Sequence, residues 1–243
     1  MSGAEIARLY RVVLWRAWPA VLLFALLMSF FLDHLTLALP DPLAPDALER
    51  YSEFLGSAGL WRAVLVVTLL SLWPTCALVI CALRLAGGAA LPFAGGLPAA
   101  LRAYPAALAL SLAYVGLTAL GLMLFVVPGI YLAGALQLWV VALLAGEASA
   151  GRALQASGRR VQHRWWRSNT MVAIVVLCGL AAGALVSLVA DLLVHVVTGI
   201  WALDAASQRL AALAVSMLGN FVTAPAYPVA LVASYRDLAT PAV

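Results

Sequence analysis

The chain has 243 residues, of which 65% are hydrophobic and 10% are charged, and its mean hydropathy is +1.05. A soluble domain has about a quarter of its residues charged, so this composition excludes an ordinary water-soluble fold. The basic residues other than histidine are all arginine. They lie beside apolar segments, so the formal charge of +4 does not indicate nucleic-acid binding.

The apolar residues fall in long runs without polar alternation, which predicts membrane-spanning helices of about 20 residues each. We predict an all-α, polytopic transmembrane helical bundle that forms a single integral membrane domain with both termini in the cytoplasm. The six predicted spans are residues 17–39, 60–85, 104–127, 130–146, 170–197 and 210–234.

The first span follows a short basic segment that contains Arg8, Arg11 and Arg16. A secretory signal peptide begins in a similar way. The apolar run that follows here, to Leu39, is too long for one, and no small-residue cleavage motif comes after it. We therefore expect an uncleaved signal anchor.

The orientation is predicted from the arginines, because loops on the cytoplasmic side of a membrane protein are enriched in basic residues. With the N-terminus inside, only Arg50, Arg62 and Arg209 fall on the opposite side. Tryptophans at the predicted boundaries agree with these spans, since indole rings favour the membrane interface. These residues are Trp15, Trp18, Trp61, Trp165 and Trp166.

The third and fourth spans meet at Val127-Pro128-Gly129-Ile130. Proline lacks a backbone donor and glycine accepts left-handed geometry, so Pro128 and Gly129 predict the tight turn of a helical hairpin. One continuous helix here would be nearly twice as long as the bilayer is thick.

The segment between the fourth and fifth spans is predicted to form a cytoplasmic interfacial amphipathic helix over about residues 148–166. Its basic arc would hold Arg152, Arg159, His163 and Arg167, and its apolar arc Leu154, Val161 and Trp165. Each arginine beside an anionic leaflet contributes roughly 1 kcal/mol to binding. The candidate residues for binding a lipid or a partner are Arg152, Arg159, Arg160, His163, Arg164, Trp165 and Arg167. The alternative is a basic loop that only sets the topology.

Ionisable residues are costly inside a membrane, so those in or near the spans are candidate sites. Glu147, at the end of the fourth span, is expected to form an interfacial ion pair with Arg152 or Arg236, or else to serve as a proton or ion site. Asp191 and His195 are four residues apart and share a helix face, which fits either a solvated helix end or a proton relay.

Other polar or small residues interrupt the apolar runs. Gln137 and Asn220 lie deep in the predicted spans, where they would hydrogen-bond across helices or line a cavity. Gly179 and Gly183 form a GxxxG motif that permits close helix contact, including dimerisation. Broken helices line sites in transporters, although proline is common in membrane helices generally. The prolines that interrupt the second and sixth spans are Pro74, Pro225 and Pro228.

No motif indicates enzymatic chemistry. The sequence contains no nucleophile elbow, zinc-protease motif, P-loop or paired-carboxylate pattern, so we expect neither catalysis nor a cofactor. The scattered histidines do not form a metal-binding pattern. Cys76, Cys81 and Cys178 lie inside apolar runs and are expected to act as small hydrophobic residues.

The stretch from Pro128 to Arg167 combines a Pro-Gly hairpin, a helix that closes with glutamate, an Ala-Leu pair, a serine and a tryptophan-rich return to the membrane. Together with the closing Tyr235-Arg236-Asp237-Leu238, it resembles the glycerophosphodiesterase membrane-domain family and the related YciC-like bacterial inner-membrane proteins. The chain has Gln162-His163 where that pattern has a glycine. The matching positions in the stretch are Pro128, Gly129, Tyr131, Glu147, Ala153, Leu154, Ser157, Val161 and Trp165.

The resemblance implies a six-helix module of the bacterial inner membrane without an assigned activity. Some members of that family carry a fused soluble glycerophosphodiester phosphodiesterase. We expect this chain to lack that activity, because its 243 residues leave no room for the catalytic domain.

The leading hypothesis is a non-enzymatic inner-membrane protein that acts in envelope or membrane homeostasis by contacting anionic lipids or a protein partner. Another membrane protein or a second copy of the chain would be that partner. The alternative is a small-molecule or ion transporter or channel that uses the proline-broken spans with Gln137, Glu147 and Asn220.

Overall fold

The computed structural model describes residues 1–40, 46–89, 96–146, 149–201 and 204–239. Within these ranges the chain is helical, with no strand, as the predicted fold class requires. The helices are α1 (Gly3–Arg16), α2 (Trp18–Ala38), α3 (Ala47–Gly56), α4 (Ala58–Ala86), α5 (Gly96–Leu124), α6 (Val126–Leu136), α7 (Trp139–Leu144), α8 (Ala150–Val161), α9 (Trp165–Trp201), α10 (Ala205–Thr223) and α11 (Ala226–Ala239).

In the described ranges, six segments are long and apolar enough to cross a membrane, and they correspond to the six predicted spans. The all-α, multi-pass architecture is therefore confirmed. The third span begins at Gly96 rather than at residue 104, and the fifth begins at Trp165 rather than at residue 170. The six segments are Trp18–Leu35, Ala58–Ala86, Gly96–Leu124, Val126–Leu144, Trp165–Val196 and Ala206–Ala239.

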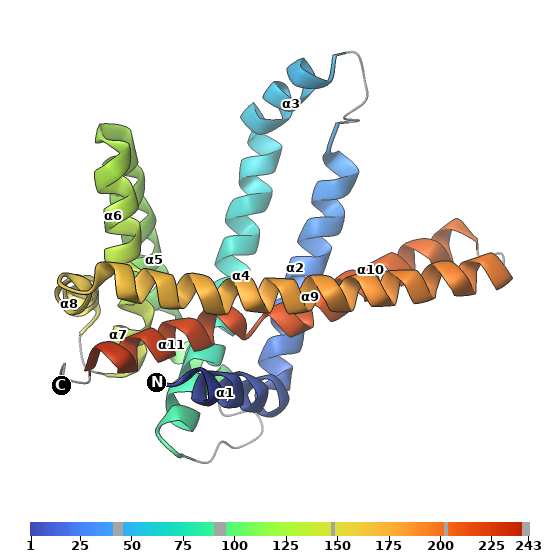
Figure 1. Cartoon of the computed structure of the whole chain (residues 1–243). Helices are drawn as coiled ribbons and strands as arrows, with labels where there is room; N and C mark the ends of the chain where they lie inside the picture. The colour runs from blue at the N-terminus through green and yellow to red at the C-terminus, as the bar shows by residue number, and fades with distance from the viewer. Residues whose placement is uncertain (41–45, 90–95, 147–148, 202–203, 240–243) are drawn as a thin grey trace.

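The spans pair as antiparallel hairpins: α2 with α4, α5 with α6, and α9 with α10. Figure 1 shows that α5 and α6 stand apart from α2 and α4 at their far ends, and that α9 runs across both hairpins. α10 also packs against α2, which joins the first and third hairpins. α9 has 37 residues and is about 55 Å long, so it exceeds the roughly 30 Å of bilayer hydrocarbon.

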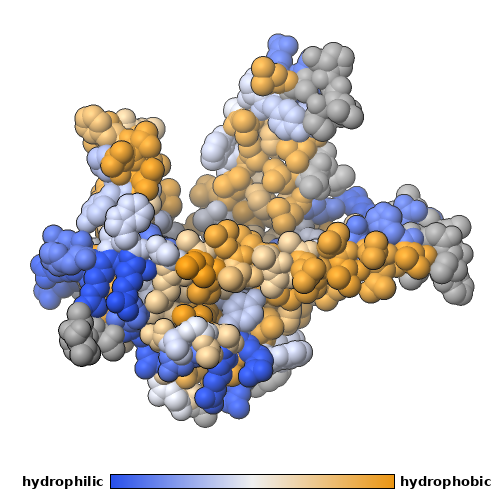
Figure 2. Space-filling model, viewed as in Figure 1, coloured by the Kyte–Doolittle hydropathy of each residue, from blue (hydrophilic) through white to orange (hydrophobic). Residues whose placement is uncertain are grey.

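The core lies at one end of the bundle, which we call the base, where α1, the second half of α4, α7, α8 and α11 pack together. Every residue is buried from Cys76 to Ala82 in α4 and from Pro228 to Tyr235 in α11. Away from the base, the hairpins expose many leucine and valine side chains, and Figure 2 shows a hydrophobic surface along α9. Apolar surface of this extent is suited to contact with lipid.

The basic N-terminal segment forms a separate helix, α1, which the sequence alone did not distinguish from the first span. A capping box begins this helix. The backbone N–H of Ser2 donates to the Glu5 carboxylate at 2.6 Å, and the Glu5 N–H donates to the Ser2 hydroxyl at 3.3 Å. The hydrogen bond from the Ser2 backbone to the ionised carboxylate lowers the pKa of Glu5 below its usual value.

The chain turns between α1 and the first span. α1 ends at Arg16, and α2 then begins with Pro19 in its first turn, where the missing N–H costs no helical hydrogen bond. Leu9 and Val13 of α1 are buried in the core, so α1 lies against the base. The sequence analysis places the arginines of this segment before the first span and predicts no separate element for them.

The hairpin between the third and fourth spans is present, but its turn lies at Phe125, three residues before Pro128. Pro128 occupies the first turn of α6. Gly129 is helical, so the expected left-handed glycine is wrong. A Cβ at Gly129 would lie 2.5 Å from the backbone nitrogen of Leu122. Gly129 is therefore needed for the close approach of α5 and α6, and not for the turn.

Two of the predicted spans are broken. The fourth is interrupted at Gln137-Leu138, between α6 and α7, and the sixth at Ala224-Pro225, between α10 and α11. Pro225 matches the predicted interruption of the sixth span, whereas Pro74 lies inside the continuous helix α4. Tyr10 of α1 donates its hydroxyl to the carbonyl of Val222, at the end of α10. The backbone beside the break in the sixth span therefore accepts a hydrogen bond from a neighbouring helix.

Candidate functional site

The predicted amphipathic helix is present as α8, but it ends at Val161, and Gln162 and His163 form a turn before α9 begins. Ala153, Ser157 and Val161 have no exposed surface and, at four-residue spacing, form one face of α8. This face packs on α6 and α7. The apolar side of α8 therefore contacts protein, and the helix spans Ala150–Val161 rather than about residues 148–166. Its contact with lipid headgroups stays a prediction.

Ser157 explains how α8 attaches to the fourth span. Its hydroxyl donates to the carbonyl of Ala135 at 2.8 Å and accepts from the backbone N–H of Leu138 at 3.1 Å. Both groups belong to the break between α6 and α7, where helical partners are missing. A buried serine thus replaces the interrupted helical hydrogen bonding.

Gln137 lies at the same break and bonds across helices. Its side-chain amide donates to the Asn169 carbonyl oxygen of α9 at 3.1 Å, and the Asn169 amide donates to the backbone carbonyl of Trp165 at 2.8 Å. A Cβ at Gly134 would collide with Asn169 and Trp165. Gln137 therefore connects α6 to α9, and Asn169 is a partner that the sequence analysis missed.

Trp165 was a candidate ligand-binding residue, but its ring joins two helices. Its indole N–H donates to the backbone carbonyl of Tyr131 at 3.0 Å, and its ring stacks on that of Tyr131 with centroids 5.9 Å apart. Trp166, the next residue, packs edge-on against Trp165 and is 78% exposed. Trp166 is thus the accessible indole at the start of α9.

Four of the predicted basic residues lie together. Arg159, Arg160, His163 and Arg164 line a pocket of about 550 Å³ between α8 and α11, which we call the basic pocket. The Arg160 guanidinium lies over the Tyr235 ring, 3.8 Å from its centroid, as in a cation–π contact. Tyr235 was noted only as part of the closing motif, because nothing in the sequence indicated its contact with α8.

The other two arginines of the predicted group lie elsewhere. Arg152 is exposed on α8 and does not line the basic pocket. Arg167 lies in the first turn of α9 and binds Asp237 of α11, with Nε 2.8 Å from Oδ2 and Nη2 3.1 Å from Oδ1. Asp237, whose side chain is 8% exposed, also contacts the amino group of Met1 at 3.2 Å.

The closing motif holds the base together. Tyr235 contacts α8, Arg236 donates to the carbonyl of Ala86 at the end of α4, and Asp237 binds α9. These consecutive residues of α11 therefore reach three different helices. Arg236 was a predicted partner of Glu147, but Glu147 lies outside the described residues.

The remaining polar candidates lie far from the basic pocket. Asn220 of α10 donates to the Ser29 hydroxyl of α2 at 2.9 Å, which is a bond across helices. His195 lies 3.6 Å from the Asp191 carboxylate on the same helix, and both side chains are more than half exposed. A solvated helix end fits this exposure.

The glycines of the GxxxG motif and the three cysteines have different surroundings in the structure. Gly179 and Gly183 face their own chain, since a Cβ on either would collide with Ala226 or Thr223. Cys76 and Cys81 are buried in the core, whereas Cys178 is exposed on the apolar helix α9. Among the described residues, no group of three or more metal-ligating side chains is close enough to hold an ion.

The fold and these contacts define a helical multi-pass membrane protein with a basic pocket at the end that carries α1 and α11. No protein-family model, no curated protein and no solved structure matches the chain.

Proposed function

We propose that the protein is a non-enzymatic, multi-pass protein of the bacterial inner membrane that binds the phosphate headgroup of an anionic phospholipid in the basic pocket. Its role would be in membrane or envelope homeostasis. The observation that carries the proposal is the gathering of Arg159, Arg160, His163 and Arg164 around one cavity. Basic pockets on the cytoplasmic side of helical bundles bind anionic headgroups.

The composition of the pocket supports a phosphate ligand. Among the described residues that line it, four are basic and none is acidic. Guanidinium groups match phosphate oxygens with two parallel hydrogen bonds, so several arginines around one cavity suit a phosphodiester. Figure 2 shows hydrophilic surface at this end of the molecule, around α8, beside the hydrophobic surface of α9.

The arginines and the topology support a cytoplasmic position for the base. Most arginines lie in segments at this end, and Figure 1 places the N-terminus beside α11, as an even number of spans requires. We also propose that the membrane is the bacterial inner membrane and that the chain is related to the YciC-like proteins that it resembles.

The observations favour lipid binding over the alternative transporter. Gln137 and Asn220, the polar candidates within the spans, bond to Asn169 and Ser29 in two separate places. Neither lines the basic pocket. A transport route would require polar groups that face one continuous cavity.

The test uses two charge reversals on the same helix. Arg159→Glu changes a residue of the basic pocket, and Arg152→Glu makes the same change at an exposed residue outside it. The full-length protein in detergent is mixed with short-chain phosphatidylglycerol or phosphatidylcholine. A lipid that binds the native state raises the thermal midpoint in a concentration-dependent way.

We expect phosphatidylglycerol to raise the midpoint more than phosphatidylcholine in the wild type and in Arg152→Glu, and this preference to be lost in Arg159→Glu. An equal response to both lipids in the wild type would overturn the proposal. So would equal losses in the two variants, which would indicate a diffuse effect of charge.

A further inference from the structure

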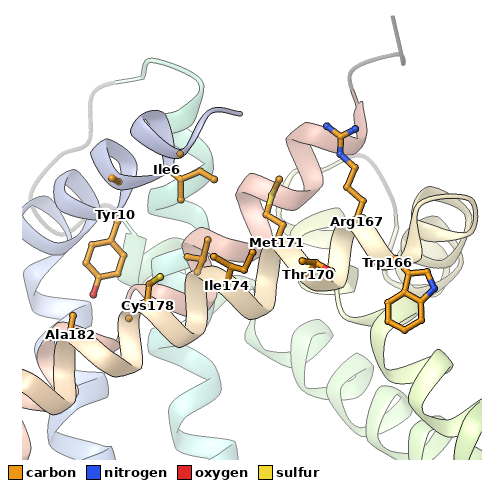
Figure 3. A pocket seen from close by; sticks show the side chains of 13 residues that line it. Ile6, Tyr10, Trp166, Arg167, Thr170, Met171, Ile174, Cys178 and Ala182 are labelled. Carbon is orange, nitrogen blue, oxygen red and sulfur yellow. The ribbon is translucent and has the colours of Figure 1, made fainter.

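An apolar groove of about 780 Å³ runs between α1 and α9. It shares no residue with the basic pocket. Figure 3 shows α1 on one side of the groove and α9 on the other. The side chains that form these two walls include Ile6, Ala7 and Tyr10 of α1 and Met171, Ile174 and Cys178 of α9.

The polar groups of the groove are few, and the two largest are engaged outside it. The Tyr10 hydroxyl donates to the carbonyl of Val222, and burial raises the pKa of Tyr10 to about 12, so this residue stays neutral. Arg167 is bound to Asp237. An occupant would therefore meet mostly aliphatic, aromatic and sulfur atoms, and an apolar occupant suits such walls.

The length and the ends of the groove match one leaflet. The lining residues of α9 run from Trp166 and Arg167 to Ala182, and the helix rises about 22 Å from Arg167 to Ala182. One leaflet together with its headgroup region accounts for about half of a bilayer thickness of roughly 40–45 Å, which is close to this length. Trp166 is 78% exposed and the Arg167 side chain 62% exposed, and both residue types favour the headgroup level.

We infer that this groove holds one acyl chain of a membrane phospholipid, with its headgroup beside Trp166 and Arg167. α9 is one of the spans, so hydrocarbon surrounds its apolar surface in the membrane. A chain in the groove is enclosed by two helices and is held more firmly than lipid that touches one helix face. The inference does not require the basic pocket to bind a headgroup.

The first experiment fills the groove. Ala182 lines it and is exposed, so Ala182→Trp occupies the space of the chain without disturbing the buried core. Ala181→Trp is the control, because Ala181 is exposed on α9 but does not line the groove. Native mass spectrometry of the full-length, partly delipidated protein counts the bound phospholipids after phosphatidylglycerol or phosphatidylcholine is added back.

We expect the wild type and Ala181→Trp to retain one more phospholipid than Ala182→Trp, whichever headgroup is supplied. Equal lipid counts in all three proteins would overturn the inference. Failure of the proposed headgroup site would instead appear as a missing preference for phosphatidylglycerol, so the two failures are distinguishable.

The second experiment uses a native thiol as the reporter. Cys178 is exposed in the groove, whereas Cys76 and Cys81 are buried. Adding phospholipid to the delipidated protein should slow maleimide labelling of Cys178 several-fold. In a Cys178→Ala, Leu180→Cys protein the thiol lies on α9 outside the groove. An equal slowing of both thiols would indicate general lipid coverage and overturn the inference.

Discussion

Arg167 and Asp237 form a two-point ion pair that joins the first turn of α9 to the end of α11. The carboxylate is 8% exposed and the arginine side chain 62% exposed, so the pair lies at the edge of the core. The neighbouring Tyr235 and Arg236 contact α8 and α4. The three consecutive residues therefore fix the relative positions of helices from both halves of the chain.

Asp237→Asn should lower the free energy of unfolding by about 1–3 kcal/mol. This destabilisation is smaller than that expected when one partner of a fully buried ion pair is removed, because Arg167 remains solvated. Unfolding in mixed micelles with sodium dodecyl sulfate, followed by circular dichroism, measures the change. Combining it with Arg167→Gln should give a total well below the sum of the single effects, and strict additivity would contradict a direct pair.

A matched control lies at the opposite end of the bundle. Arg209 binds Asp33 at 2.9 Å, but the side chains are 57% and 25% exposed. Arg209→Gln should therefore cost at most about 1 kcal/mol.

Ser157→Ala should cost about 1–3 kcal/mol, because it leaves the carbonyl of Ala135 and the N–H of Leu138 without their buried partner. The same micellar unfolding measures the effect. Ser52→Ala, which removes an exposed hydroxyl bonded to the Glu49 carbonyl, should change stability by less than about 0.5 kcal/mol. A Ser157→Ala protein as stable as the wild type would show that the break in the fourth span does not depend on α8.

The number and positions of the spans could be predicted because the hydropathy of a segment indicates whether it lies in lipid or in water. The interruption of the sixth span was indicated by Pro225, but the break in the fourth span could not be predicted, since it depends on hydrogen bonds with a residue from elsewhere in the chain. At this break the Ser157 hydroxyl accepts from the N–H of Leu138 and donates to the carbonyl of Ala135, and nothing near these two residues in the sequence indicates that partner.

The basic pocket was predicted only in part. The sequence indicated a basic cluster between the fourth and fifth spans, but it was projected as one continuous helix, whereas the chain turns at Gln162 and His163. Because of this turn, Arg167 lies in α9 and forms an ion pair with Asp237, whereas Arg159 remains in α8 and lines the pocket beside α11. Tyr235 completes the pocket through a contact with Arg160 across most of the second half of the chain, which periodicity cannot reveal.

Gly129→Ala and Gly116→Ala should have opposite effects. An added methyl at Gly129 would lie 2.5 Å from the backbone of Leu122, so α5 and α6 must separate and the protein should lose at least about 1 kcal/mol. Gly116 is in the middle of α5 with nothing within 4 Å of an added Cβ. Alanine there should leave stability unchanged or raise it by about 0.5–1 kcal/mol through helix propensity. Equal destabilisation by both changes would argue against the close approach.

The orientation of the base can be tested with single thiols in a Cys178→Ala protein, whose other two cysteines are buried. Arg159→Cys and Arg50→Cys place exposed thiols at opposite ends of the bundle. A membrane-impermeant maleimide applied to intact spheroplasts should label Arg50→Cys, and it should label Arg159→Cys only after the membrane is opened. This follows because arginine-rich segments stay on the cytoplasmic side during insertion. The reverse pattern would move the basic pocket to the outer leaflet and remove the argument that it faces cytoplasmic anionic lipid.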